Sequence, residues 1–164
     1  MADRVTYYFY TARVFLGEGD FSKAEARLEY ALKHCHHESE ANIQRILVFL
    51  VPLRMMLGKP PPTPELLERH FLATEFTDVI EALQLGDLTL FKKSIDVHEE
   101  FYAKHGIFLL VMKLKSLIYR QLFRRVWLLR EKSAELHLSD FKVALKVSGE
   151  VRHLLGSGLE LELV

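Results

Sequence analysis

The sequence is poor in the residues that form disulfides and tight turns. Cys35 is the only cysteine among 164 residues, so the chain can form no internal disulfide, as is usual in a reducing compartment such as the cytosol or nucleus. The 8 glycines and 5 prolines make about 8% of the chain, against roughly 12% in an average protein. Such a composition favours long helices over many short strands. It excludes a collagen, a disulfide-rich secreted scaffold and a disordered tail.

The chain also lacks a long apolar run. The longest, residues 46–53, is flanked by Arg45 and Arg54 and falls well short of the ~20 residues that a helix needs to cross a bilayer. Residues 1–10 have neither the leucine-rich core nor the small-residue cleavage site of an export signal. We therefore expect a soluble protein.

Net charge is absent overall, with 22 basic and 22 acidic residues, but the charges are segregated. Residues 1–112 carry 12 basic and 16 acidic side chains, and residues 133–164 carry 3 and 5. Residues 113–132 carry seven basic side chains and one acid, a net charge of +6. A concentrated cationic segment of this kind attracts phosphate or an acidic partner.

Apolar periodicity predicts one helix after another and no strand of useful length before residue 158. The expected helices cover about 3–16, 21–37, 38–57, 64 onward, 75–85, 88–105, 107–129 and 140 onward. Asp20 or Ser22 and Asp87 are candidate N-caps, and Gly86 and Gly106 are expected to stop helices. Pro52 should kink the third helix or end it early. The predicted fold class is all-α, with stacked antiparallel helical pairs.

The first two helices match the size pattern of a tetratricopeptide repeat. Small residues let two antiparallel helices approach closely, and large residues fill the groove between them. The matching positions are Tyr8, Ala12, Phe15, Ala24, Leu28 and Ala31. An ordinary helical hairpin explains the same pattern, and both interpretations imply stacked helix pairs.

No motif supports catalysis, a metal site or a cofactor. Residues 34–37 read His-Cys-His-His, but neighbouring side chains on a helix point about 100° apart and cannot converge on one ion. Cys35 has no glycine-rich elbow and no oxyanion hole around it, and no phosphate-binding glycine loop is present. We therefore expect a protein that is not an enzyme and needs neither metal nor cofactor.

The helix over residues 107–129 combines an apolar stripe with a cationic face. The stripe consists of Ile107, Val111, Leu114, Ile118, Leu122, Val126 and Leu129. Lys113, Arg120 and Arg124 fall on the opposite face. This face is either an ordinary solvated surface or a site of phosphate contact. Arg125 falls on the apolar side, so it is either paired inside or marks a break in the helix.

Several phrases of the sequence resemble the PCI-domain protein family. They are residues 50–58 (LVPLRMMLG), 98–101 (HEEF), 105–108 (HGIF), 117–120 (LIYR) and 122–126 (LFRRV). The resemblance covers about residues 7–147 and is closest to the PCI subunit of the nuclear-pore-associated complex that couples transcription to mRNA export. The chain starts at what looks like an internal helix and departs from the family after Val147, so it looks truncated at both ends.

The resemblance implies a non-catalytic scaffold. Residues 1–121 would be the helical-repeat part of a PCI domain and residues 122–147 the start of an incomplete winged helix. Residues 148–164 would be a divergent tail that either folds or is disordered. The implied partners are a larger PCI-domain scaffold protein and a small acidic disordered subunit, without membrane or small-molecule substrate.

The same resemblance implies a basic surface for RNA or DNA near the start of the winged helix. Lys113, Arg120, Arg124 and Arg125 are the candidate nucleic-acid-binding residues. The implied location is the nucleus, at the nuclear pore, with some protein in the cytoplasm. The alternatives are a subunit of a proteasome-lid or signalosome type of PCI complex and a stand-alone helical-repeat adaptor.

Overall fold

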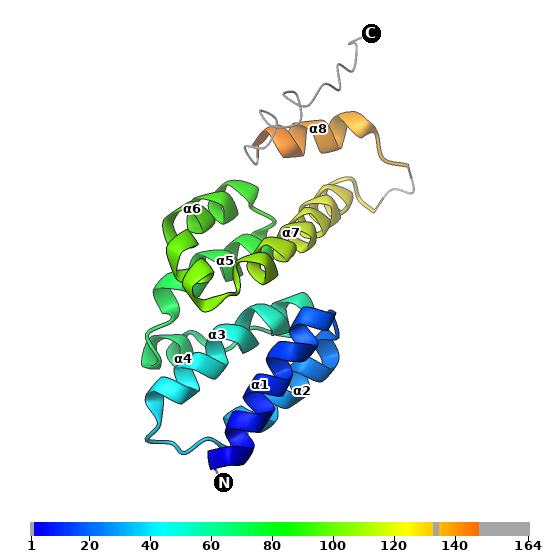
Figure 1. Cartoon of the computed structure of the whole chain (residues 1–164). Coiled ribbons are helices and arrows are strands. Elements are labelled where there is room, and N and C mark those ends of the chain that lie inside the picture. Colours follow the sequence, from blue (N-terminus) through cyan, green and yellow to red (C-terminus); the bar gives the residue numbers. More distant parts are fainter. Residues whose placement is uncertain (1, 133–134, 148–164) are drawn as a thin grey trace.

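The described part of the chain, residues 2–132 and 135–147 of this computed structural model, consists of helices and their connections. The helices are α1 (Ala2–Glu18), α2 (Phe21–His34), α3 (Glu40–Met56), α4 (Pro64–Arg69), α5 (Ala73–Leu85), α6 (Leu88–His105), α7 (Phe108–Leu129) and α8 (Leu138–Val147). They stack from the α1–α2 pair at one end of the molecule to α8 at the other (Figure 1). No strand occurs in these residues, which confirms the all-α prediction. None of the helices in this part of the chain is long and apolar enough to cross a membrane.

The α1–α2 hairpin packs through the face that the repeat pattern predicts. Ala12, Ala24 and Ala31 are completely buried, as is Leu28. The turn between the helices is short, and the Asp20 carboxylate accepts a hydrogen bond from the backbone N–H of Lys23, which caps α2. Small side chains at the contact let the two helices lie close together (Figure 1).

Helix α3 runs through Pro52 to Met56. Of the two alternatives for Pro52, a kink or an early end, the early end is excluded, and α3 ends within one residue of the expected position. Every residue from 46 to 53 is buried, Pro52 included. A proline inside a helix removes one backbone hydrogen bond, and the burial of apolar side chains on all sides of α3 offsets that loss.

Two glycines end helices where the sequence predicts. Gly86 after α5 and Gly106 after α6 both have left-handed backbone conformations, with φ of 69° and 71°. Between the two helices, the Asp87 carboxylate accepts hydrogen bonds from the N–H groups of Thr89 and Leu90 and caps α6. Gly86 has a second constraint, because a Cβ atom there would lie 2.7 Å from the backbone nitrogen of Leu122 in α7.

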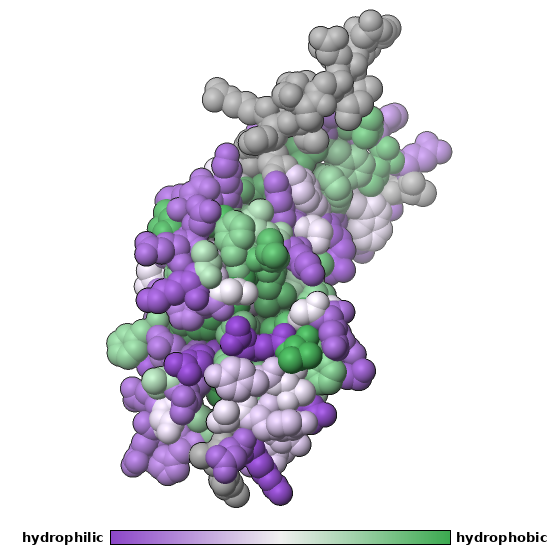
Figure 2. Space-filling view, viewed as in Figure 1, coloured by the Kyte–Doolittle hydropathy of each residue, from purple (hydrophilic) through white to green (hydrophobic). Residues whose placement is uncertain are grey.

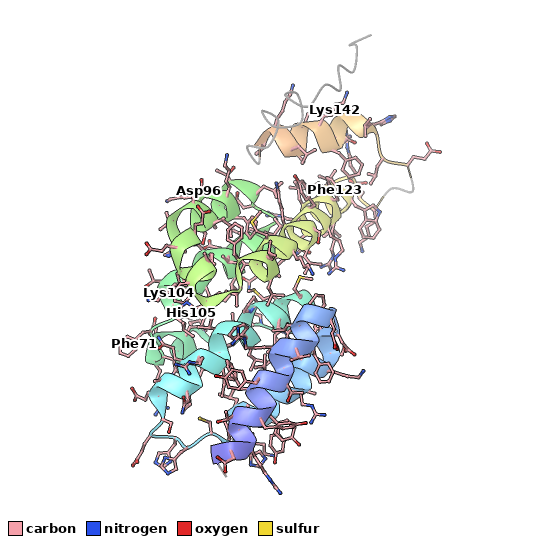
Figure 3. The ribbon with its side chains drawn as sticks, in the orientation of Figure 1. Phe71, Asp96, Lys104, His105, Phe123 and Lys142 are labelled. Atoms are coloured by element: carbon pink, nitrogen blue, oxygen red, sulfur yellow. The ribbon has the colours of Figure 1, made fainter. Side chains whose placement is uncertain are left out.

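Helix α4 ends without a glycine at the left-handed position. Phe71 occupies the left-handed position after the helix, with φ of 55°, and its side chain is 77% exposed. The Phe71 N–H donates to Glu68 and the Leu72 N–H donates to the Leu67 carbonyl, which is the Schellman pattern of helix termination. Leu67 and Leu72 are buried, so the turn is anchored on both sides of an outward-pointing phenylalanine (Figure 3).

Helix α7 connects most of the molecule, because it packs on α3, α5, α6 and α8. It is continuous from Phe108 to Leu129, so the predicted domain boundary after residue 121 falls inside one helix. Helix α8 covers residues 138–147 and lies within the segment 122–147 that the resemblance assigns to the start of a winged helix. The predicted tail, residues 148–164, lies outside the described residues.

Candidate nucleic-acid interface

The apolar stripe of α7 faces the core over most of its length. Ile107, Val111, Leu114, Ile118 and Val126 are buried, and Leu122 is half-buried against the core. Leu129 is 83% exposed, so its assignment to the buried stripe is wrong. The last turn of α7 reaches beyond the helices that cover the rest of the stripe (Figure 1).

Three of the four candidate basic residues lie on the outer face of α7. Lys113, Arg120 and Arg124 are all exposed. The Lys113 ammonium lies 5.0 Å from the ring centre of Phe21 at the start of α2, a cation–π contact. Arg120 and Arg124 form no ion pair or hydrogen bond with any residue of the described chain. Their charges are therefore available to a ligand.

Arg125 does not belong to this face. Its guanidinium donates a hydrogen bond to the carbonyl of Leu85, the last residue of α5. A cation at a helix C-terminus satisfies a free carbonyl and interacts favourably with the negative end of the helix dipole. Helix α7 continues to Leu129, so Arg125 marks no break in the helix. The residue is exposed, and its hydrogen bond ties α7 to the α5–α6 turn beside Gly86.

Two aromatic residues that are not among the predicted site residues also lie on this face. Phe123 and Trp127 are each 37% exposed and share the outer face with Arg120 and Arg124, since positions i, i+3, i+4 and i+7 of a helix lie on one side. We call these four residues the α7 ridge. The Phe123 ring packs edge-on against Phe141 of α8, with 4.9 Å between ring centres. Figure 3 shows Phe123 at this junction, near the end of α7.

An apolar groove lies behind the ridge, between the start of α6, the end of α7 and α8, with a volume of about 1140 Å³. Its walls include Leu122, Val126 and Val143, and the guanidinium of Arg130 pairs with the Asp140 carboxylate across it. The pair lowers the pKa of Asp140 through a hydrogen bond from Arg130. Asp140 thus helps to hold α8 against α7 while its carboxylate is ionised.

Apolar side chains remain exposed at the α8 end of the molecule. Leu129, Leu138, Val143 and Val147 are between 59% and 83% exposed, and Figure 2 shows apolar side chains gathered there. The resemblance to PCI-domain proteins implies such exposure for Phe141, Leu145 and Val147, because the chain departs from the family after Val147 and these side chains would lack their usual cover. The prediction holds for Val147, whereas Phe141 and Leu145 are half-buried, Phe141 against Phe123 and Leu145 against the core.

The histidine-rich segment after α2 has no metal-binding geometry. Among the described residues, no group of three or more His, Cys, Asp or Glu side chains is placed to hold a metal ion. The rings of His36 and His37 stack on each other, with centres 4.6 Å apart. Cys35 lines a cavity of about 360 Å³ with Phe9 and Ile46. Burial raises the pKa of the Cys35 thiol, which keeps it protonated and weakly nucleophilic at neutral pH.

Curated proteins from several kingdoms resemble the chain along most of its length. PCI domain-containing protein 2 of Xenopus laevis is 42% identical over 146 residues, which is 89% of this chain and 36% of that protein. Enhanced ethylene response protein 5 of Arabidopsis thaliana is 36% identical over 126 residues, 77% of this chain and 30% of that protein. Protein CSN12 homolog of Schizosaccharomyces pombe is 32% identical over 146 residues, 88% of this chain and 34% of that protein.

These relatives are much longer than the segment that they share with the chain. The chain spans about a third of the length of the curated relatives it matches. A comparison with models of known protein families gives no match.

Proposed function

Because the chain belongs to the PCI-domain protein family, we propose that it is a non-catalytic scaffold segment of a nuclear mRNA export complex. In this role it binds a larger PCI-domain partner and a small acidic subunit, and it contributes a basic surface for nucleic acid. We propose the nucleus, at the nuclear pore, as its main location, with some protein in the cytoplasm. The observation that carries the proposal is the ordered likeness to PCI domain-containing protein 2 over 89% of the chain.

The α8 end of the molecule supports the proposed PCI partner. Its exposed apolar side chains and the groove behind the α7 ridge form an uncovered surface of the kind that marks a protein–protein contact. Solvent contact of these side chains is unfavourable, by about 25 cal/mol for each Å² of apolar surface. A partner that covers the groove would gain this free energy.

The free cations of α7 support the proposed nucleic-acid surface. Arg120 and Arg124 have no anionic partner in the described residues, and they lie within the segment of net charge +6. Phosphate contacts by such side chains position a nucleic acid without reading its sequence. We therefore place the proposed contact at Arg120 and Arg124, with Lys113 further along the helix, and we assign Arg125 to the fold.

Copurification tests the scaffold role. The tagged chain is coexpressed with a PCI-domain scaffold protein and with the acidic subunit. Xenopus PCI domain-containing protein 2, tagged and coexpressed in the same way, serves as the positive control. We expect the chain to copurify with both partners. Replacement of Val143 and Val147 by Ser, at positions 59% and 83% exposed, should weaken capture of the PCI partner without unfolding the chain. If the Xenopus relative captures the two partners and the chain does not, the proposal is refuted for this segment.

A second candidate is a subunit of another PCI complex, because one relative is named Protein CSN12 homolog. The fold and the exposed groove serve either complex equally well. Parallel copurification with PCI subunits of the export, signalosome and proteasome-lid types distinguishes them. Preferential capture of a signalosome or lid subunit would replace the export proposal.

A further inference from the structure

A cavity of about 360 Å³ lies between the first turns of α1, the residues that follow α2 and the first turns of α3. All of its lining residues belong to the described part of the chain. Pockets that hold small molecules in proteins have volumes of about 300–1,000 Å³. Helix α8 lies at the other end of the molecule (Figure 1), so this cavity is separate from the α7 ridge and from the proposed PCI contact.

The inner wall of the cavity is apolar and closely packed. Phe9 and Ile46 are buried, Val5 is half-buried, and Cys35 packs on the core. The Phe9 ring packs edge-on against Phe49 of α3, with 5.6 Å between ring centres, which fixes the position of this wall. Transfer of a hydrocarbon group from water to such a wall is favourable.

The mouth of the cavity is polar and positively charged. Arg45 is exposed, and among the lining residues it alone carries a permanent charge. It forms no ion pair or hydrogen bond with any residue that the structure describes. His34 and His36 also line the cavity, whereas none of its lining residues is acidic. The Glu38 carboxylate, 3.9 Å from the His36 ring, lies outside the lining. The mouth therefore favours an anion.

We infer that this cavity binds a small amphipathic anion, an unbranched aliphatic carboxylate. Its hydrocarbon chain lies against Val5, Phe9 and Ile46, and its carboxylate pairs with Arg45. A guanidinium can donate two parallel hydrogen bonds to a carboxylate, and such charge-assisted bonds are about twice as strong as neutral ones. Phosphate would leave the apolar wall in contact with water, and a neutral hydrocarbon would leave Arg45 without an anion. Only a ligand with both parts matches both the wall and the mouth.

Isothermal titration calorimetry of the full chain with octanoate measures the affinity. We expect a dissociation constant of about 1 mM or below, which corresponds to efficient binding of a ligand with about ten non-hydrogen atoms. Hexanoate, which is shorter by two methylene groups, should bind about 15-fold more weakly, because each methylene contributes about 4-fold. Octanol has the same hydrocarbon chain without the charge and should also bind more weakly than octanoate.

The single cysteine locates the binding site. Cys35 lines the cavity and is the only cysteine of the chain, so its reaction with N-ethylmaleimide can be followed by mass spectrometry. Octanoate should slow this reaction, with half of the effect at the dissociation constant that calorimetry gives. Acetate at the same concentration has the charge without the hydrocarbon chain, and it should leave the rate unchanged.

Three variants separate the charge from the apolar wall. Arg45→Gln should weaken octanoate binding by about 10-fold to 150-fold, the usual effect of losing a hydrogen bond to a charged group, and should leave octanol binding unchanged. Lys33→Gln is the matched control, because Lys33 is exposed and does not line the cavity; it should bind octanoate normally. Val5→Trp fills the cavity and should abolish binding of both ligands. Circular dichroism verifies folding, and if Val5→Trp does not fold, Arg45→Gln decides.

Three outcomes would overturn the inference. Absence of binding at about 10 mM octanoate would remove the cavity as a ligand site. Equal affinities for octanoate and octanol would show that the cavity takes up hydrocarbon without recognising an anion. Unchanged octanoate affinity of a folded Arg45→Gln variant would show that the carboxylate does not bind at Arg45. Copurification with the PCI partner is a separate measurement, so failure of this site is distinguishable from failure of the scaffold role.

Discussion

Replacing Gly86 by alanine tests the close approach between the α5–α6 turn and α7. Gly86 has φ of 69°, and an added Cβ atom would lie 2.7 Å and 2.9 Å from the backbone nitrogen and Cα of Leu122. The left-handed conformation costs alanine about 1–2 kcal/mol, and overpacking adds about 1–3 kcal/mol. Because the clashing atoms belong to a helix backbone, a rotamer change cannot relieve them. We expect Gly86→Ala to lower the free energy of unfolding by about 2–5 kcal/mol.

Gly106 provides the matched control. Its φ is 71°, but a Cβ atom there would meet nothing within 4 Å, so Gly106→Ala should cost only the backbone component, about 1–2 kcal/mol. Asparagine tolerates the left-handed conformation, so Gly86→Asn compared with Gly106→Asn isolates the steric component.

Urea denaturation followed by circular dichroism measures these differences, provided that the m-value is unchanged. In a chain of this size each kcal/mol shifts the melting temperature by about 2–4 °C. Equal losses at the two glycines would refute the close approach.

Three further predictions concern the rest of the fold. Phe71→Gly should raise the free energy of unfolding by about 0.5–1 kcal/mol, because it relieves a left-handed phenylalanine that is 77% exposed; Phe71→Ala, which keeps a Cβ atom, should give no such gain in the same urea titration. Burial raises the pKa of Tyr102 to about 12, above its ordinary value near 10. The folded chain therefore retains a proton that the unfolded chain releases. Stability should be constant below about pH 10 and fall by about 3 kcal/mol as the pH rises through 12. Tyr102→Phe should flatten this decline, and it also removes the hydrogen bond from the Tyr102 hydroxyl to the Glu75 carbonyl; an unchanged pH profile would contradict the assignment. Lys59→Met should destabilise the chain by about 1–3 kcal/mol, because the Glu25 carboxylate, with 5% exposure, loses the ammonium 2.5 Å away. The double variant Glu25→Gln/Lys59→Met should recover part of that loss in thermal melts, and a further loss would contradict the argument.

The helix ends that depend on local chemistry could be predicted from the sequence. Asp20 and Asp87 cap helices through hydrogen bonds to N–H groups two or three residues later, and Gly86 and Gly106 adopt the left-handed conformation that favours glycine. Each of these signals acts within one turn of helix. A sequence interpretation can therefore recognise them without knowledge of the packing.

Tertiary packing decides the chain conformation at Pro52 and at the end of α4; the sequence leaves the first open between a kink and an early end and predicts no end for the second. Helix α3 continues through Pro52 because residues 46–53 are buried on every side. The helix propensity of a single residue does not include this burial. The turn at Phe71 is held by the burial of Leu67 and Leu72, so a phenylalanine takes the position where glycine is usual.

The candidate site was predicted in part. The spacing of Arg120 and Arg124 identified the outer face of α7, and helical periodicity alone was sufficient for that. The same spacing contains Phe123 and Trp127, but aromatic residues are more often buried, so only the exposed fractions distinguish them. The role of Arg125 required the position of the Leu85 carbonyl, 40 residues away in sequence.

The continuity of α7 restricts how the length of this chain can vary. One inserted residue turns everything after it by about 100° around the helix axis. An insertion between Leu114 and Arg120 would therefore rotate Arg124 and Trp127 away from solvent and bring polar positions into the core. Length changes are expected instead in connections such as residues 57–63, which lie outside the helices. The helical geometry of α7 thus fixes which of its positions are buried and which are exposed. Substitutions in α7 can be tolerated, whereas insertions and deletions cannot.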